Sequence, residues 1–327
     1  MIAITGGGTG GHLVIAKAIK EELNKRGIKP IFIGSTYGQD KAWFENDEGW
    51  EETYFFETSG VVNKKGIKKL FSLTNILKYT FKTRQIFKKH KIQKVFSVGG
   101  YSAAPASFGA ILFKKDFYIH EQNAYMGKLN KLLSPYAKRV FDTFKFNDPY
   151  PIRDEFFDNA RVRKELKTII FLGGSQGAKA INDFAFQVAK MDKFKIIHQT
   201  GSKDFQRCKE FYENNNFNVE YFDFSPNLID KIVKADFAIC RAGASTLFEL
   251  TSNQLPALFI PYPYAAGNHQ FYNAKYLVDK GLAYMRLEKE LNINVFEEIK
   301  NVDIISNKLK EINHKDGSKI IVDEILK

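Results

Sequence analysis

Two glycine-rich turns, far apart in the chain, limit the folds available to it more than any other feature. The first turn is residues 5–12, Thr-Gly-Gly-Gly-Thr-Gly-Gly-His, and the second is residues 173–178, Gly-Gly-Ser-Gln-Gly-Ala. Each follows a short apolar run and precedes a stretch with helical spacing. A strand, a glycine turn and a helix start form a phosphate site, because bare N–H groups and the positive helix end face the anion. Two such sites in opposite halves predict paired α/β domains with anionic ligands meeting between them.

The rest of the chain continues the alternation of strand and helix, which predicts parallel sheets. A length of 327 residues is long for one α/β domain and comfortable for two. The most proline-dense loop, residues 147–151, predicts the boundary. We therefore expect a first domain over residues 1–148 and a second over residues 149–314.

Positive charge is concentrated in one segment. The chain has 49 Lys and Arg against 37 Asp and Glu, a formal net charge of +12. Residues 58–115 contain 13 basic residues and no acidic one, so the remainder is close to neutral. Such a segment favours a polyanion or an anionic membrane surface as partner.

Other features disfavour several classes of protein. The two cysteines, Cys208 and Cys240, lack the spacing of a zinc site or disulfide framework, which fits a reducing compartment. The first predicted strand begins at Ile2 and leaves no room for a cleaved signal peptide. The longest weakly polar run, residues 102–113, contains Pro105 and is too short to cross a bilayer. We expect a protein that is soluble or peripheral to a membrane.

Within the basic segment, residues 64–94 interleave cations with apolar side chains over an arc wider than core packing needs. That surplus fits a helix lying on anionic lipid. Its expected membrane contacts are Lys64, Lys65, Ile67, Lys68, Lys69 and Phe71. Nucleic acid is the rival partner, but no nucleic-acid-binding signature accompanies the charge, so we expect none. A solvated helix beside the core is the simplest alternative.

The first turn also satisfies the dinucleotide fingerprint, with glycines at positions 6, 8 and 11. An NAD site requires an acidic residue at the end of the second strand, and residues 30–36 contain none, which disfavours NAD. His12 starts the following helix, whose positive end disfavours a charged imidazole. It is therefore a candidate base, with a capping role as the alternative.

Polar side chains follow three further predicted strands. His-Glu-Gln-Asn at 120–123 stands at a strand's carboxyl end, where open α/β sheets bind ligands. Residues 241–249 form a strand–turn–helix junction whose small residues admit a phosphate or a uracil edge, and Glu249 could accept both ribose hydroxyls. The polar row at 269–274 suits a sugar. An ordinary polar loop, a solvated Glu249 and a capping row are the structural alternatives.

Taken together, these motifs resemble the MurG family of glycosyltransferases. The match consists of Gly-Gly-Thr-Gly-Gly-His at 7–12, Gly-Gly-Tyr at 99–101, His-Glu-Gln-Asn at 120–123, Pro-Ile-Arg at 151–153, Gly-Gly-Ser-Gln-Gly-Ala at 173–178, His-Gln-Thr-Gly at 198–201, Cys-Arg-Ala-Gly-Ala-Ser-Thr-Leu-Phe-Glu at 240–249, Leu-Pro-Ala-Leu-Phe-Ile-Pro at 255–261 and His-Gln-Phe-Tyr-Asn-Ala at 269–274. The segments occur in the family's order and span nearly the whole chain.

The resemblance implies an α/β GT-B fold: two Rossmann-like domains with parallel sheets facing across a cleft, and a C-terminal helix, about residues 315–327, packed back on the first. It implies an inverting transferase that moves N-acetylglucosamine (GlcNAc) from UDP-GlcNAc to the MurNAc 4-hydroxyl of lipid I, the undecaprenyl-pyrophosphoryl-MurNAc-pentapeptide. The product would be lipid II, the peptidoglycan precursor. The first domain would bind acceptor and membrane, at the cytoplasmic face of the bacterial inner membrane, and the second would bind the donor. Anionic inner-membrane lipid and cell-wall synthesis proteins are the further partners that it suggests.

Residue roles follow from the same resemblance. Donor contacts are expected at Thr9, Gly10, Gly11, Asn123, Arg153, Ser175, Gln176, Gly177, Arg241, Ala244, Ser245, Glu249 and Gln270. Acceptor contacts are expected at Gly8, Gly10, Gly11 and Tyr101. His12 is the candidate base, with His120 and Glu121 as alternatives for catalysis or positioning. A helix N-terminus and main-chain amides would stabilise the UDP leaving group without a required metal or cofactor, while stimulation by a divalent cation stays open.

The chain departs from the family pattern at three places. Asp-Pro-Tyr-Pro precedes Ile152-Arg153 where many relatives carry Gly-Asn-Pro, and His269 stands where some have Gln. Residues 225–227, Ser-Pro-Asn, replace an acidic pair beside the uracil loop, which leaves base recognition there unassigned. A related transferase acting on diacylglycerol is the nearest alternative function, and a basic nucleic-acid-binding protein is the more distant one.

Overall fold

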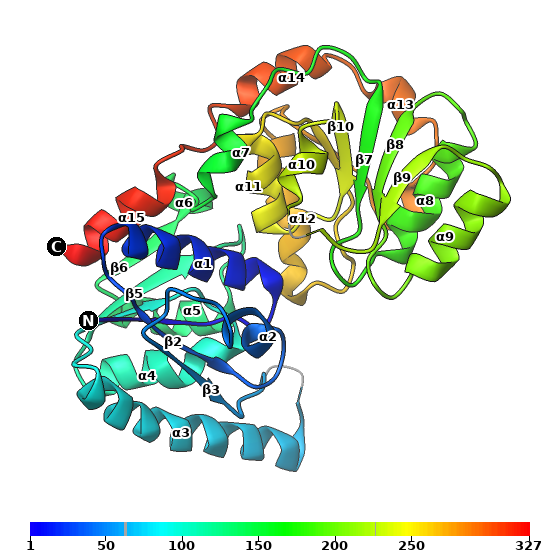
Figure 1. Ribbon diagram of the computed structural model, residues 1–327. Helices are drawn as coiled ribbons and strands as arrows, with labels where there is room; N and C mark the ends of the chain where they lie inside the picture. The colour runs from blue at the N-terminus through cyan, green and yellow to red at the C-terminus, as the bar shows by residue number, and fades with distance from the viewer. Residues whose placement is uncertain (62–63, 226) are drawn as a thin grey trace. The chain divides into compact units, whose positions relative to one another are not determined.

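The computed structural model describes residues 1–61, 64–225 and 227–327. Pro226, in the loop at 225–227 that differs from the family pattern, therefore lies outside the described residues. The chain forms two compact units (Figure 1). The first unit is Met1–Ile152 together with Asp316–Lys327, and the second is Arg153–Lys315. Each unit is built on one six-stranded sheet, and all strand pairs in both sheets are parallel.

The first sheet has the strand order β3-β2-β1-β4-β5-β6. Its strands are β1 (Ile2–Thr5), β2 (Ile31–Ser35), β3 (Glu52–Phe56), β4 (Lys94–Ser97), β5 (Asp116–Glu121) and β6 (Arg139–Asp142). The connecting helices are α1 (Gly10–Lys25), α2 (Asp40–Phe44), α3 (Gly66–Lys89), η1 (Tyr101–Ala103), α4 (Ala104–Leu112), α5 (Lys128–Leu133), η2 (Ser134–Tyr136) and α6 (Thr143–Phe146). All residues of β1 and β2 are buried, as expected for central strands of a parallel sheet covered on both faces.

Helix α3 buries only a narrow strip of its surface. Tyr79 stacks on Phe56 of β3, with ring centroids 4.7 Å apart. Thr83 lies against Gly109 of α4, where an added Cβ would come within 2.2 Å of the threonine hydroxyl. The absence of a side chain at Gly109 therefore allows the two helices to pack closely, while most other side chains of α3 face outward.

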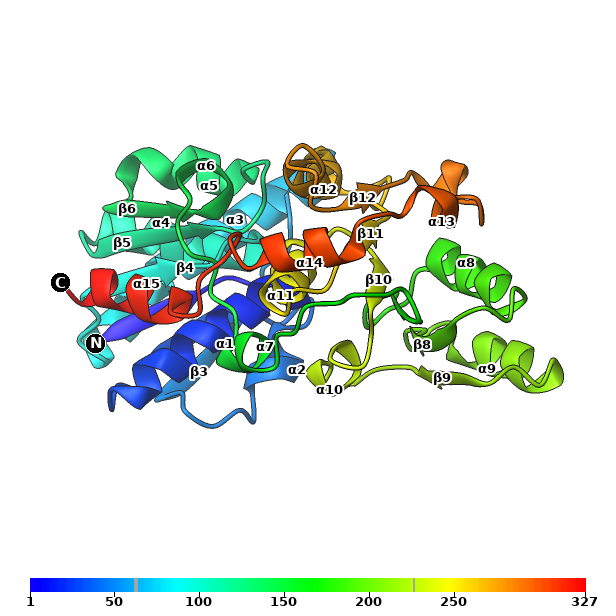
Figure 2. The same ribbon diagram turned by 90° about the horizontal axis from the view of Figure 1, so that it is seen from above.

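The C-terminal helix α15 (Gly317–Leu326) belongs to the first unit and runs beside α1 in both views (Figure 1 and Figure 2). Ile321 and Val322 of α15 are fully buried. An ion pair of 2.6 Å joins Arg26, at the end of α1, to Asp323.

The second sheet has the order β12-β11-β10-β7-β8-β9. Its strands are β7 (Thr168–Leu172), β8 (Lys195–Gln199), β9 (Val219–Phe222), β10 (Phe237–Cys240), β11 (Ala257–Phe259) and β12 (Tyr284–Met285). The helices are α7 (Asp154–Asp158), α8 (Lys179–Ala189), α9 (Phe205–Asn214), α10 (Ile229–Ile232), α11 (Ala244–Ser252), η3 (Ala266–Asn268), α12 (His269–Val278), η4 (Glu288–Glu290), α13 (Val295–Glu298) and α14 (Val302–Leu309). A core of Ile, Phe and Ala side chains from β7, β10 and α8 holds this unit together.

The division of the chain differs slightly from the boundary expected after residue 148. Residues 149–152 remain with the first unit because Tyr150 and Ile152 are buried there. The Tyr150 ring meets the imidazole of His120 edge-on at 5.4 Å, and its carbonyl oxygen lies against Gly317. The return segment joins the first unit at Asp316, next to the expected start at residue 315.

Among the described residues, no helix combines the length and the apolar character needed to span a bilayer. Cys208 and Cys240 are both buried free thiols.

Candidate functional site

The two sequence motifs of the second unit meet at one point of its sheet. Strands β7 and β10 are neighbours, and their last residues, Leu172 and Cys240, are paired in register. From β7 the chain continues to β8 on one side, and from β10 it continues to β11 on the other. The strand order therefore reverses between β7 and β10, which is where open α/β sheets bind ligands.

The turn after β7 requires glycine for steric reasons. Gly174 and Gly177 have φ angles of 76° and 86°, in the left-handed region. A Cβ on Gly177 would lie 2.6 Å from the carbonyl oxygen of Thr200, so a side chain would collide with the neighbouring main chain. The turn leads directly into α8, whose first N–H groups have no acceptor within the helix and form a site for anions.

A hollow of about 640 Å³ opens at this end of the sheet. It is lined by Gly173, Gln176, Gly177, Ala178, Lys179, Ala180, Asp183, Arg241, Tyr262, Gln270 and Glu288. Four of these, namely Gln176, Gly177, Arg241 and Gln270, were predicted as donor contacts from the sequence. Gly173 and Ala178 belong to the glycine turn that was predicted to bind an anion. The other lining residues were missed, although Lys179 and Ala180 directly follow that turn.

Arg241 is held in the wall of the hollow. Its guanidinium forms an ion pair with Glu288, donates to the carbonyl oxygen of Ile260 at 3.1 Å, and lies over the Tyr262 ring at 5.4 Å. Glu288 lies in η4, far along the chain, so no local pattern identifies it. Gln270 accepts a hydrogen bond of 2.9 Å from the main-chain N–H of Tyr262.

The lining carries a second set of charges. Lys179 forms an ion pair with Asp183 at 2.7 Å, and Arg207 reaches the same carboxylate at 2.6 Å. The lining therefore contains two cations, Lys179 and Arg241, and two carboxylates, Asp183 and Glu288. A dianionic ligand in the hollow would compete with these carboxylates for the cations.

Nine predicted donor contacts are not part of the lining. Four of them, Thr9, Gly10, Gly11 and Asn123, belong to the first unit, and five belong to the second: Arg153, Ser175, Ala244, Ser245 and Glu249. Glu249 lies on α11, is half-buried, and has its pKa raised to about 7 by burial; Arg153 opposes this rise and Glu155 reinforces it. Arg153 is ion-paired with Glu155 at 2.8 Å. Ser175 belongs to the glycine turn, and its carbonyl oxygen accepts the N–H of Ser202 at 3.0 Å.

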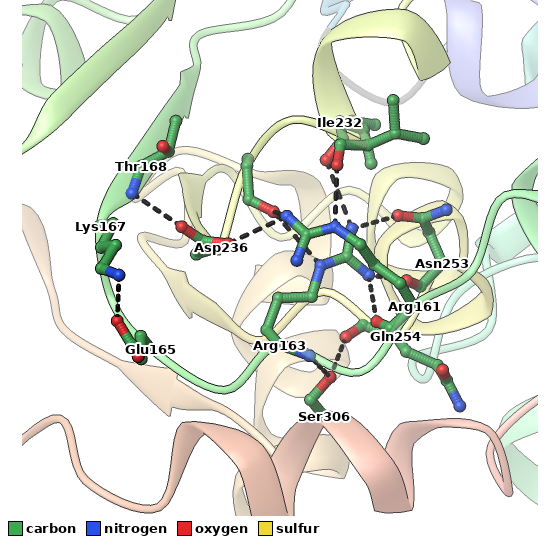
Figure 3. Close-up of polar contacts among 12 residues, drawn as sticks. Arg161, Arg163, Glu165, Lys167, Thr168, Ile232, Asp236, Asn253, Gln254 and Ser306 are labelled. Carbon is green, nitrogen blue, oxygen red and sulfur yellow. Dashed lines mark hydrogen bonds and ion pairs between the residues drawn. The ribbon is translucent and has the colours of Figure 1, made fainter.

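The far end of α11 is fixed by a buried arginine (Figure 3). Arg163 is fully buried, and its guanidinium donates to both the carbonyl and the side-chain oxygen of Asn253, which caps α11. It also donates to Ala235 at 3.2 Å and to Ile232 at 3.4 Å. Burial, with a smaller contribution from the nearby charge of Arg161, lowers the pKa of Arg163 to about 9. A cation at a helix C-terminus stabilises the helix dipole, so Arg163 fixes the helix that carries Ala244, Ser245 and Glu249.

A buried polar network lies beneath the second glycine turn. Asn182 donates through its side-chain amide to Thr200 and Asp204, at 3.0 and 2.7 Å, so its oxygen is left to accept from His198 at 2.9 Å. The other ring nitrogen of His198 then accepts from the Tyr212 hydroxyl at 2.7 Å. Burial lowers the pKa of His198 to about 3, which keeps the imidazole neutral. The His-Gln-Thr-Gly motif thus supports the turn from below.

The first unit has an equivalent site at the ends of β1 and β4. Thr5 and Ser97 are paired in register, and the strand order again reverses between these two strands. Gly6, Gly7 and Gly8 follow β1 with φ angles of 119°, 151° and 86°. Three successive positive values are accessible only to glycine, so this turn also requires its sequence.

His12 lies at the start of α1 beside this turn. It is half-buried, and its Nδ1 atom is 3.0 Å from the Thr9 hydroxyl. Gly99 lies next to its ring, since an added Cβ there would be 3.5 Å from Nε2. A partly accessible imidazole with one nitrogen oriented by a neighbour has the arrangement of a general base.

His120 and Glu121 lie deeper than His12. His120 is fully buried, neither of its ring nitrogens has a hydrogen-bond partner among the described residues, and burial together with His12 lowers its pKa to about 3. Glu121 accepts from the N–H groups of Asn123 and Gly127, both at 3.0 Å, and from Asn130 at 2.8 Å. The hydrogen bonds of Glu121 therefore favour a role in positioning neighbouring groups. Of the two histidines, only His12 has a partly accessible imidazole.

Most of the remaining predicted contacts of the first unit belong to or adjoin the same turn, whereas Asn123 lies beside Glu121. Tyr101 packs against Gly8, where an added Cβ would be 2.5 Å from its ring. The main-chain N–H of Gly8 donates to the carboxylate of Asp40, so this N–H points into the protein. Thr9, Gly10 and Gly11 form the beginning of α1. Asp40 was missed from the sequence because it lies after the next strand.

The predicted membrane segment lies at the start of α3. Ile67, Leu70 and Phe71 are 86%, 62% and 65% exposed, and the lysines at positions 65, 68 and 69 are exposed among them. Lys64 differs, because its ammonium donates to the hydroxyl of Ser72 at 2.8 Å. In the part of the chain that the structure describes, no group of three or more His, Cys, Asp or Glu side chains is placed to hold a metal ion.

Both sheets reverse their strand order between two neighbouring strands, which is where open α/β sheets bind ligands. The comparison with known proteins identifies the family. The glycosyltransferase family 28 N-terminal domain matches residues 2–142, and the family 28 C-terminal domain matches residues 168–325. The chain belongs to glycosyltransferase family 28, and within it to the MurG transferases.

Relatives align over the full chain. A UDP-N-acetylglucosamine–N-acetylmuramyl-(pentapeptide) pyrophosphoryl-undecaprenol N-acetylglucosamine transferase of Campylobacter fetus is 54% identical, covering 100% of both chains. Its counterpart in Nitratiruptor is 50% identical over 100% of this chain and 98% of its own. The crystal structure of Acinetobacter baumannii MurG superposes with a TM-score of 0.81 at 27% identity, covering 100% of this chain and 98% of that one. The predicted α/β fold class and family are confirmed.

Proposed function

We propose that this chain transfers GlcNAc from UDP-GlcNAc to lipid I and forms lipid II, the peptidoglycan precursor. The observation that carries the proposal is full-length identity of 50–54% to relatives named for this transfer. Glycine turns at both sheet reversals support it. The substrates are thus UDP-GlcNAc and lipid I.

The second unit binds the donor. Its hollow holds the diphosphate against the glycine turn and the N-terminus of α8, with Lys179 and Arg241 as the charged contacts. Gln270 lies in the same wall and presents an amide to the sugar hydroxyls. Glu249, on the helix that follows Arg241, accepts the ribose hydroxyls.

The first unit binds the acceptor and supplies the base. The glycine turn and the start of α1 bind the diphosphate of lipid I, and His12 removes the proton from the MurNAc 4-hydroxyl as that oxygen attacks the anomeric carbon. The bond to the UDP oxygen breaks in the same step, so an α-linked donor gives a β-1,4 product. Main-chain amides and cations stabilise the negative charge that develops on the UDP leaving group, and no metal ion is required.

The enzyme acts at the cytoplasmic face of the inner membrane. The exposed apolar and basic side chains at the start of α3 suit an anionic lipid surface, where the lipid-linked acceptor resides. Proteins of cell-wall synthesis are the further partners expected at that surface.

The proposal is tested by incubating the purified chain with labelled UDP-GlcNAc and either a lipid I analogue or diacylglycerol, with and without a metal chelator. Label is expected on the lipid I analogue alone, in the presence of the chelator as well. His12→Gln should retain UDP binding and lose turnover, which separates the base from the donor site. Label on diacylglycerol only would remove the proposed acceptor.

A further inference from the structure

The first glycine turn is held from inside the protein by a single carboxylate. Asp40, the first residue of α2, is completely buried. One of its oxygens accepts the N–H of Gly8 and the other accepts the N–H of Ser35 at 2.9 Å. Gly8 follows β1 and Ser35 ends β2, so one side chain joins the main chain at the ends of two neighbouring strands.

The position of Asp40 is itself fixed by the core. Phe44, at the other end of α2, is fully buried between Phe32 and Trp50, at ring-centroid distances of 4.6 and 5.0 Å. Helix α2 is only five residues long, so this anchor sets the place of the carboxylate as well. The support under the glycine turn is therefore rigid.

The glycines around this carboxylate leave no room for side chains of their own. A Cβ on Gly7 would lie 2.5 Å from one carboxylate oxygen of Asp40, and a Cβ on Gly34 would lie 2.9 Å from the other. On its other side, the N–H of Gly7 donates to the carbonyl oxygen of Gly99 at 3.1 Å. Glycines at positions 7 and 34 thus leave the space that the buried carboxylate fills.

The compensation for this buried charge is main-chain hydrogen bonding. Burial raises the pKa of Asp40, and hydrogen bonds from Gly8 and Ser35 lower it in part; no cation is among the causes of the shift. Burying a carboxylate without a cation is costly, so a site that keeps one needs a reason beyond packing. Here the carboxylate directs the Gly8 N–H into the protein and so fixes the turn that leads into α1.

We propose that Asp40 is a positioning residue for the acceptor, which fixes the glycine turn so that the beginning of α1 binds the diphosphate of the lipid-linked substrate. This inference rests on the proposed function of the first unit. Asp40 touches neither substrate; it acts through the main chain of Gly8.

The test is a kinetic comparison of Asp40→Asn with Asp142→Asn in the full-length chain. Asn keeps the size of Asp40 but presents an NH₂ group to one of the two N–H donors, so one anchor of the turn is lost. Asp142 is a matched control, because it is also a buried carboxylate of the first unit and accepts a main-chain N–H, that of Lys145 at 3.0 Å. It has no contact with the glycine turn among the described hydrogen bonds.

For Asp40→Asn, the KM for a soluble lipid I analogue should rise about five- to tenfold, the effect of losing one ordering hydrogen bond, while the KM for UDP-GlcNAc stays within about twofold. Asp142→Asn should lower the melting temperature to a similar degree and leave both KM values unchanged. An unchanged acceptor KM for Asp40→Asn, or an equal rise for both substrates, overturns the inference. A wild-type chain without transfer activity would instead remove the proposed function.

If Asp40→Asn does not fold, hydrogen exchange of the wild-type chain gives a second test. The Gly8 amide should already be protected without ligand, and the amides at the start of α1 should gain protection when the lipid I analogue is added. Protection of Gly8 that appears only with the analogue contradicts the role of Asp40.

Discussion

Leu172 and Cys240, the last residues of β7 and β10, are aligned side by side in the second sheet although they lie far apart in the chain. Because both strands end at the same level, the glycine turn after one and Arg241 after the other form the walls of one hollow. This alignment brings two separate sequence motifs into the lining of a single hollow.

The ion pair of Arg241 with Glu288 predicts opposite effects of two substitutions. Arg241→Gln should weaken UDP binding by about 1.5–3 kcal/mol, because a charged hydrogen bond to the diphosphate is lost. Glu288→Gln should strengthen UDP binding severalfold, since it removes a negative charge from the hollow and releases Arg241. Calorimetric titration with UDP measures both.

The ion pair of Arg286 with Glu298 supplies the controls, because neither residue lines the hollow. Arg286→Gln and Glu298→Gln make the same changes of charge in the same unit and should leave UDP affinity unchanged. Equal effects from both pairs would indicate long-range electrostatics in place of contact with the ligand.

The raised pKa of Glu249, about 7, predicts that donor affinity depends on pH. An ionised carboxylate accepts ribose hydroxyls better than a neutral one, so affinity for UDP-GlcNAc should rise between pH 6 and pH 8. Glu249→Gln should abolish this rise, and Glu249→Ala should weaken binding at pH 8 by about 1–3 kcal/mol. A wild-type affinity that is flat across this range excludes the ribose contact.

The same shift predicts the pH dependence of stability. The pKa of Glu249 is higher in the folded protein than its ordinary value. Its contribution to stability is therefore fully present at a pH below the ordinary value, and it is lost as the pH rises through about 7. Glu249→Gln should therefore match the wild type in thermal unfolding near pH 5 and exceed it near pH 8. The opposite trend would show that Glu249 is stabilised in its charged form.

Buried Arg163 predicts a large loss of stability confined to the second unit. Arg163→Leu leaves several buried carbonyl oxygens without a donor and should cost more than about 3 kcal/mol, since each such group costs about 1–3 kcal/mol. Arg161→Leu, at a neighbouring side chain that is 42% exposed, should cost about 1 kcal/mol.

Both tryptophans, Trp43 and Trp50, lie in the first unit, so their fluorescence in urea reports that unit alone. Circular dichroism reports both units. For Arg163→Leu, an early transition should appear in circular dichroism while the fluorescence transition stays in place. A shift of the fluorescence transition as well would contradict a local role.

The start of α3 predicts a charge-dependent affinity for membranes. Replacing Lys65, Lys68 and Lys69 by Gln should weaken binding to anionic vesicles by about 1 kcal/mol per lysine and spare turnover on a soluble acceptor analogue. The same triple change at Lys190, Lys193 and Lys195, which are exposed lysines of the second unit, is the control for charge. Equal losses from both triples would show that net charge alone drives binding.

The sequence predicts those parts of the molecule that depend on local chemistry. The glycine turns are recognisable because positive φ angles and close main-chain contacts require glycine, and His12 and Gln176 adjoin or belong to such turns. The parallel sheets follow from the alternation of strand and helix. The charged and exposed start of α3 follows from composition alone.

The residues that the sequence did not predict, Asp40 and Glu288, contact segments that are distant in the chain. Asp40 contacts Gly8 across 32 positions, and Glu288 contacts Arg241 across 47. No local pattern distinguishes either carboxylate from a solvated surface residue. Their roles depend on strand order, which brings the segments together only after folding.

The most direct test of the donor site is a crystal structure of the chain soaked with uridine diphosphate. We predict density in the hollow of the second unit, with the diphosphate against the turn at 173–178 and beside Arg241. Density at another place, in a protein that still transfers GlcNAc, would contradict this prediction.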